Sequence, residues 1–218
     1  SANLHVSGDE SYSRLLSALE RIDRANPGAV RGWGMDHCTM VNPKDIPRAA
    51  KLGIMWSCQP LGEGDRAPMV AEAFGDSVAH TYVAPIKSML DAGINVSLEG
   101  LWSGIETLIT RKDEHGRVWG PDQRVDKATA LQIATRNGAE YVQKSDRLGS
   151  IEVGKLADLV VLDRDYLMIP EEEISEIRSS MTLLGGKIIF LHPDFSQEHK
   201  LMPEGALIST LEKLRERR

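Results

Sequence analysis

The feature that most constrains the fold of this chain is an alternation of short apolar runs and helical segments up to about residue 141. Between residues 9 and 25 the apolar side chains recur at helical spacing, and Asn26, Pro27 and Gly28 end that helix. Alternating units of this kind predict parallel strands joined by right-handed helical crossovers. The predicted strands end at His5 or cover 33–38, 52–60 and 93–100; the predicted helices cover 9–25, 43–51, 79–92 and 126–141, with a polar loop at 62–76.

A different pattern follows in the last third of the chain. Residues 159–162 are an unbroken apolar run that ends at Asp163, and turn residues precede it. Such a run predicts a strand buried on both faces. Further along, "TLLGGKIIF" predicts a hairpin that turns at Gly185 and Gly186. We therefore expect separate β structure after the alternating units.

Charge and cysteine content exclude several classes of protein. The chain has 26 Lys and Arg against 32 Asp and Glu, a formal net charge of -6, so it lacks the electrostatic pattern of a nucleic-acid-binding protein. Two cysteines, Cys38 and Cys58, are too few for a disulfide scaffold, and their apolar surroundings predict buried thiols. Since no long apolar segment or leader is present, we expect a cytoplasmic protein with no membrane partner. The chain opens at Ser1 directly in strand, which suggests entry partway through a longer protein.

Three side chains that can bind metal follow predicted strands. His5 ends the first strand, His37 lies at the end of the second and Glu99 at the end of the fourth. Four units fit either a small doubly wound sheet or half of an α/β barrel, and in barrels the catalytic groups project from the carboxyl ends of several strands. A single histidine is more often structural, but the shared placement favours a site. Gln59 and Trp102 are candidates for lining its pocket.

Several motifs together resemble the amidohydrolase superfamily, in the branch that includes N-substituted formamide deformylases. They are "HVSGDES", "GMDHCTMVNPKDIPRAAKLGIMWSCQP" and "GSIEVGKLADLVVLDRD". The resemblance implies an α/β fold: the C-terminal half of a (β/α)8 TIM-type barrel, about four units, followed by strands of a small β-sandwich. It implies a partial barrel at 1–145, sandwich strands at 146–192 and a tail with a helix at 193–218.

The resemblance also implies a chemistry. Members of this superfamily hold a divalent metal, usually zinc, which activates water for attack on a carbon bound to nitrogen in a small amide-like substrate. His5 and His37 match the family's histidines on the fifth and sixth barrel strands, as metal ligands or, for His37, as the group that polarises the carbonyl. On the eighth strand the family has an Asp, and here Glu99 is the nearest carboxylate. Glu99 is therefore predicted as a metal ligand and general base.

The family's remaining ligands have no counterpart in this sequence. Its first strand carries two histidines one residue apart, a spacing found nowhere here, and His80, His115, His192 and His199 fall in helix or loop contexts. We therefore expect the chain to need the N-terminal half of the same enzyme or a second copy, and to be inactive alone. Two alternatives stay open: a non-catalytic truncated fragment that self-associates, and a free-standing doubly wound domain. The absence of a glycine-rich phosphate loop counts against the second.

Overall fold

The first sheet carries the predicted strands in parallel order. The computed structural model describes residues 1–60, 66–100, 102–202 and 205–209. In its first sheet, Leu4 lies opposite Met35, Met35 opposite Trp56, and Trp56 opposite Val96. The strand order is β1 (Asn3–Leu4), β2 (Gly34–Met35), β3 (Met55–Cys58) and β4 (Val96–Leu98), so chain order and sheet order coincide. In the described part of the chain β1 and β4 remain the two edges of this sheet.

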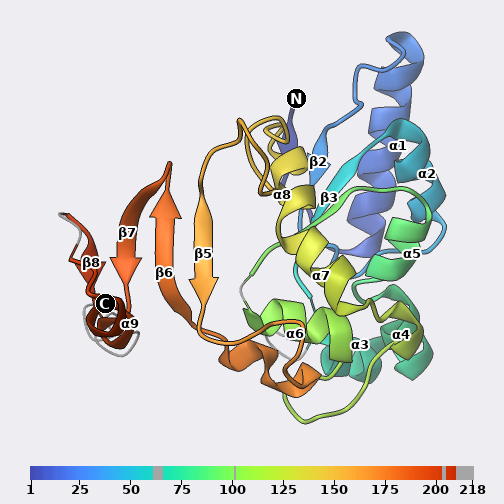
Figure 1. The fold of residues 1–218 in the computed structure, drawn as a ribbon. Coiled ribbons are helices and arrows are strands. Elements are labelled where there is room, and N and C mark those ends of the chain that lie inside the picture. Colours follow the sequence, from blue (N-terminus) through green and yellow to red (C-terminus); the bar gives the residue numbers. More distant parts are fainter. Residues whose placement is uncertain (61–65, 101, 203–204, 210–218) are drawn as a thin grey trace.

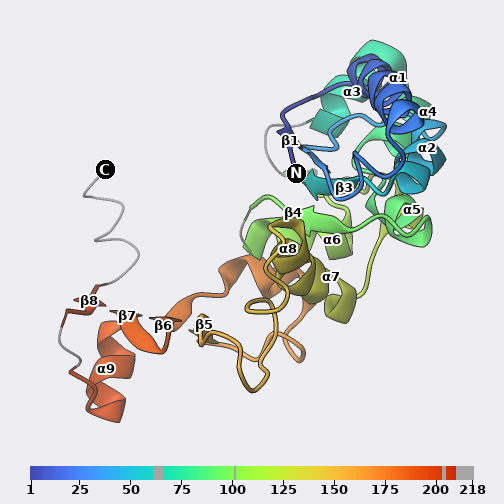
Figure 2. The same ribbon diagram turned by 90° about the horizontal axis from the view of Figure 1, so that it is seen from above.

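Helices cover the parallel sheet on both sides. Figures 1 and 2 show α1 and α2 on one side and α7 and α8 on the other. None of the helices in the described ranges is long and apolar enough to cross a membrane. The helices up to α8 are α1 (Asp9–Ala25), α2 (Asp45–Leu52), α3 (Arg66–Phe74), α4 (Asp76–Tyr82), α5 (Ile86–Asp91), α6 (Trp102–Thr110), α7 (Lys127–Ala134) and α8 (Arg136–Tyr141), with a 3-10 turn η1 (Pro121–Gln123) before α7.

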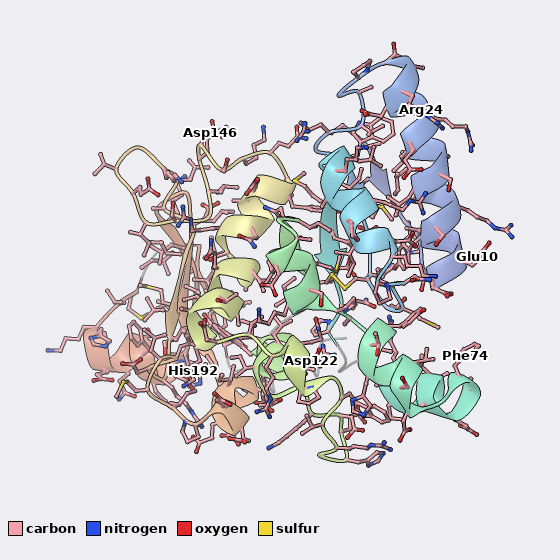
Figure 3. The ribbon with its side chains drawn as sticks, turned by 90° about the vertical axis from the view of Figure 1, so that its right-hand side faces the viewer. Glu10, Arg24, Phe74, Asp122, Asp146 and His192 are labelled. Atoms are coloured by element: carbon pink, nitrogen blue, oxygen red, sulfur yellow. A yellow bond between two sulfur atoms is a disulfide. The ribbon has the colours of Figure 1, made fainter. Side chains whose placement is uncertain are left out.

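Part of the core lies between the sheet and α1. Tyr12, Leu16 and Leu19 stand on one face of α1, at the spacing that places side chains along a single helix stripe, and all three are buried. Tyr12 meets Trp56 of β3 edge to face, with ring centroids 5.0 Å apart. Figure 3 shows this helix from the side, with Glu10 and Arg24 marking its two ends. An acidic first turn and a basic last turn suit the helix dipole.

Several helix predictions need correction. The predicted loop at 62–76 contains α3, and α6 was not predicted. The predicted helix at 79–92 is two helices, because Pro85 disfavours helical backbone at Ala84, whose φ is 44°. The predicted helix at 126–141 is likewise divided, into α7 and α8, at Thr135. Asp126 caps α7, because its side chain accepts a hydrogen bond from the Thr129 amide at 2.7 Å.

The second sheet stands beside the first (Figure 1). Its predicted hairpin is confirmed, with antiparallel β6 and β7 turning at Gly185 and Gly186. The prediction that residues 159–162 are buried on both faces is wrong: β5 is an edge strand, and Val160 is 50% exposed. The elements of this region are β5 (Leu159–Leu162), η2 (Glu171–Glu176), β6 (Ser179–Leu184), β7 (Lys187–Leu191), α9 (Pro193–His199) and β8 (Leu207–Ile208).

The two cysteines differ from their prediction in one respect. Cys38 and Cys58 are fully buried, as expected. They are not free thiols, however, because their sulfur atoms are joined in a disulfide between Cα atoms 5.0 Å apart. Cys58 ends β3, and Cys38 lies three residues beyond β2. Parallel neighbouring strands bring these two ends together, which explains how residues 20 positions apart can pair.

Candidate active site

Two imidazole rings face each other at the carboxyl ends of β1 and β2. His5 directly follows β1, and His37 lies two residues beyond β2. Because the strands are parallel neighbours, their carboxyl ends meet at one edge of the sheet. The Nε2 atoms of the two rings are 2.7 Å apart, and the rings meet edge to face with centroids 4.5 Å apart. The structure therefore brings His5 and His37 together, as the pattern of residues at the strand ends predicted.

Glu99 completes this group from β4. Its backbone N–H donates to the Cys58 carbonyl at 2.8 Å, so Glu99 continues the line of β4. One carboxylate oxygen lies 2.8 Å from His37 Nδ1, and the other accepts the His37 backbone N–H at 3.2 Å. An ionised carboxylate is only an acceptor, so it places the His37 proton on Nδ1 and leaves the Nε2 lone pair directed at His5. The side chains of His37 and Glu99 are mostly shielded from solvent, with 21% and 23% of their surface exposed.

The two Nε2 atoms are at hydrogen-bonding distance from each other, and imidazole is also a donor type that zinc binds. Zinc binds imidazole nitrogen at about 2.0–2.1 Å, and a ligating histidine usually donates its other ring N–H to a carboxylate. His37 and Glu99 show that pairing. Glu99 itself lies on the Nδ1 side of the ring, so the three predicted ligands do not converge on one point. Within the described ranges no group of three or more His, Cys, Asp or Glu could hold a metal ion.

The backbone at His37 was not foreseen. His37 and Cys38 have φ values of 74° and 41°, in the left-handed region that residues other than glycine enter at a cost of about 1–2 kcal/mol each. Such conformations persist where the surroundings over-determine them, and they gather at functional sites. No residue type in "MDHC" signals this turn, because the usual marker, glycine, is absent there.

The two predicted pocket residues have different surroundings. Gln59 follows β3, and its backbone N–H donates to the His37 carbonyl at 3.1 Å. Its side-chain Oε1 is buried and has no hydrogen-bond partner among the described residues. Trp102 opens α6 and lies against Tyr166, with ring centroids 6.0 Å apart. Gln59 therefore contacts His37 through its backbone, whereas Trp102 packs on Tyr166 in the segment that leads into η2.

A cavity lies elsewhere, between α7, α8 and residues 148–160. Its volume is about 680 Å³, and its lining is mainly apolar, with Leu131, Val142 and Leu156 among the residues that contribute. None of the histidines or Glu99 lines it. The cavity is therefore separate from the candidate site.

Comparison with known proteins identifies the family. The model of the amidohydrolase family matches residues 1–190. The chain is 31% identical over 194 residues to the N-substituted formamide deformylase of Arthrobacter pascens, an alignment that covers 84% of this chain and 35% of that protein. The chain thus spans about a third of the length of this relative.

Solved structures share the fold. A metal-dependent hydrolase of uncharacterised function from Pyrococcus horikoshii OT3 aligns with a TM-score of 0.62 and 22% identity, covering 78% of this chain and 35% of that one. An adenosine deaminase from Xanthomonas campestris with bound zinc aligns with a TM-score of 0.60 and 20% identity, covering 99% and 48%. At these identities the likeness concerns the fold. Together with the match over residues 1–190, it leads to one conclusion: this chain belongs to the amidohydrolase family.

Proposed function

We propose that this chain carries part of the active site of a metal-dependent hydrolase that cleaves a C–N bond in a small amide-like compound. The observation that carries the proposal is the facing Nε2 pair of His5 and His37, with Glu99 on the far nitrogen of His37. A related protein is a formamide deformylase, and a structural neighbour is a zinc-containing adenosine deaminase. Both names describe removal of a group through a C–N bond.

The architecture we propose is the C-terminal half of a (β/α)8 barrel over residues 1–145. Its support is the parallel sheet with helical crossovers and the metal-capable residues at one end of its strands. We propose that residues 146–192 belong to a small β-sandwich and that 193–218 form a tail. α9 lies in that tail, and residues 203–204 and 210–218 of it lie outside the described residues. The N-terminal half of the same enzyme, or a second copy of the chain, would supply the missing strands and ligands.

His5 and His37 would hold the metal through Nε2. A divalent ion such as zinc supplies, when bound, a water made acidic enough to attack a carbonyl-type carbon. Glu99 would keep His37 in the tautomer that presents Nε2. The general-base role proposed for Glu99 requires its carboxylate to leave His37 Nδ1 and turn toward the attacking water in the complete enzyme. A ligand role for Glu99 and carbonyl polarisation by His37 remain the alternatives within this proposal.

Gln59 would bind substrate. Its buried Oε1 lacks a partner in the described part of the chain, and an amide N–H of the substrate would satisfy it. Trp102 would form an apolar wall, since it comes three residues after Glu99 at the start of α6. The Gln59 acceptor and the Trp102 ring together suit a small substrate with both polar and apolar parts.

The test uses the full-length protein. We expect stoichiometric zinc by atomic absorption, and release of formate or ammonia from N-substituted formamides or amino-substituted heterocycles. Loss of zinc to a chelator should abolish the release, and added zinc should restore it. Turnover that survives complete removal of metal would contradict the proposal.

A further inference from the structure

We infer that Tyr141 is a positioning residue that holds His5 and His37 at their mutual distance, acting through Asn3 and Asp36. The inference rests on the proposed function, in which these two histidines bind metal. Tyr141 is the last residue of α8, more than 100 positions from either histidine along the chain. We refer to Asn3, Asp36 and Tyr141 as the strand clamp.

The contacts of the strand clamp join the two strands that carry the histidines. The Tyr141 hydroxyl lies 2.5 Å from Asn3 Oδ1 and 3.1 Å from Asp36 Oδ1. Asn3 Nδ2 donates to the other Asp36 oxygen at 3.3 Å. Asn3 is in β1, two residues before His5, and Asp36 directly precedes His37. One phenol thus bridges β1 and the end of β2.

Asp36 is held at its backbone as well. Its carbonyl accepts from the Tyr12 hydroxyl at 3.0 Å and from Trp56 Nε1 at 3.3 Å. Its N–H donates to the Leu4 carbonyl at 3.2 Å. The left-handed turn begins at the next residue, so the direction of the His37 side chain depends on how firmly Asp36 is fixed.

Gly34 leaves room for this arrangement. A Cβ atom at position 34 would lie 2.7 Å from Tyr141 Cζ and 2.8 Å from Asn3 Oδ1, closer than such atoms can approach. The φ of Gly34 is not in the left-handed region, so backbone conformation does not require glycine here. Glycine is required at position 34 because Tyr141 and Asn3 approach it so closely.

The phenol stays protonated at neutral and moderately alkaline pH. Burial, with a further contribution from the negative charge of Asp36, raises the pKa of Tyr141 well above its ordinary value of about 10. The hydroxyl therefore keeps its proton and its hydrogen bond at neutral and moderately alkaline pH.

The test compares Tyr141→Phe with Tyr166→Phe in the 218-residue chain. Tyr166 is the matched control, because its hydroxyl also donates one hydrogen bond, to the Lys127 carbonyl at 2.7 Å, away from the histidines. Two properties are measured: the His37 tautomer, from ring ¹⁵N shifts with ¹⁵N-histidine, and the Kd for Zn²⁺ from titration of the His5 and His37 signals. Thermal unfolding of each variant reports general stability.

Tyr141→Phe should mix the two His37 tautomers and raise the Kd for Zn²⁺ about tenfold, the low end for outer partners of metal ligands. Tyr166→Phe should change neither. Asn3→Ala, at an exposed position, should shift both in the same direction as Tyr141→Phe and serves if the latter fails to fold. The inference would be overturned if Tyr141→Phe and Asn3→Ala kept the parent's His37 tautomer and Kd for Zn²⁺. It would also be overturned if Tyr166→Phe changed both properties as much as Tyr141→Phe does. A parent chain whose histidine signals ignore Zn²⁺ would leave the proposed function to be decided by the zinc and turnover tests on the full-length protein, and the tautomer alone would then decide the inference.

Discussion

At the scale of single residues, the site depends on which nitrogen of His37 carries a proton. Glu99 fixes that choice through its contact with Nδ1. Glu99→Gln keeps an oxygen that can accept from Nδ1–H, yet the amide is a far weaker base than a carboxylate. In the full-length enzyme we expect the turnover number to fall at least about a hundredfold, with zinc content roughly preserved.

The matched control for Glu99→Gln is Glu10→Gln. Glu10 lies on the exposed side of α1, where it pairs with Arg14 at 2.7 Å. This substitution should leave both turnover and zinc content at the parent values. If Glu99→Gln turns over like the parent, Glu99 is not the base.

Replacing His37 by Ala is a second prediction at this scale. The change removes the Nε2 donor and the partner of Glu99, so the proposal expects lower zinc content and turnover reduced by about a hundredfold or more. His199→Ala, on α9, is the control, because its ring packs on Phe195 and takes no part in the candidate site. Steady-state kinetics and atomic absorption on the same preparations give both values. A His37→Ala enzyme with full zinc and full turnover would refute the assignment.

The sequence predicted the meeting of His5, His37 and Glu99, because the ends of parallel strands lie at one edge whatever the details of packing. It did not predict the Cys38–Cys58 bond, the turn at His37 or the role of Tyr141. Each of these depends on how closely two distant segments approach. That distance is set by side-chain packing, which does not produce a periodic pattern in the sequence.

At the scale of elements, α7 depends on its cap. The hydrogen bond from the Thr129 amide lowers the pKa of Asp126, so its contribution to stability is present above the ordinary pKa of Asp and is lost as pH falls through the lowered folded value. We expect Asp126→Ala to reduce the free energy of unfolding by about 1 kcal/mol at neutral pH. The difference from the parent should shrink in acid. Urea unfolding at several pH values measures it.

The control for Asp126→Ala is Asp91→Ala, which removes an exposed pair with Lys87 at the end of α5. Its effect should stay within about 0.5 kcal/mol. If the two variants lose the same free energy of unfolding, the cap does not stabilise α7 beyond an ordinary surface contact.

Helices and strands with a strong apolar period could be predicted from the sequence, whereas the breaks within helical segments could not. The stripe of α1 and the hairpin of β6 and β7 were predicted from pattern alone. The break between α4 and α5 has a local signal in Pro85 that the apolar spacing outweighed. α3 lies within the segment predicted as a polar loop, and no element was predicted at α6.

At the scale of the whole molecule, the described chain leaves strand edges and apolar side chains unpaired. In the described part of the chain β1, β4, β5 and β8 are edge strands, and Val160, Leu184 and Ile189 of the second sheet are exposed. Unpaired edges and exposed apolar side chains favour association. We therefore predict that the isolated chain is a dimer or larger at micromolar concentration by sedimentation velocity, and that it hydrolyses no amide. A clean monomer would count against the first statement, and metal-dependent turnover by this chain alone against the second.

The buried disulfide has a consequence for measuring motion. Cys38 follows His37 in the chain, Cys58 precedes Gln59, and neither sulfur is accessible from solvent. A reductant such as dithiothreitol can attack the bond only during moments when this part of the protein opens. The rate at which free thiols appear in native buffer would therefore measure how often the strand ends around His37 open. A bound metal or substrate that closes the site would lower that rate.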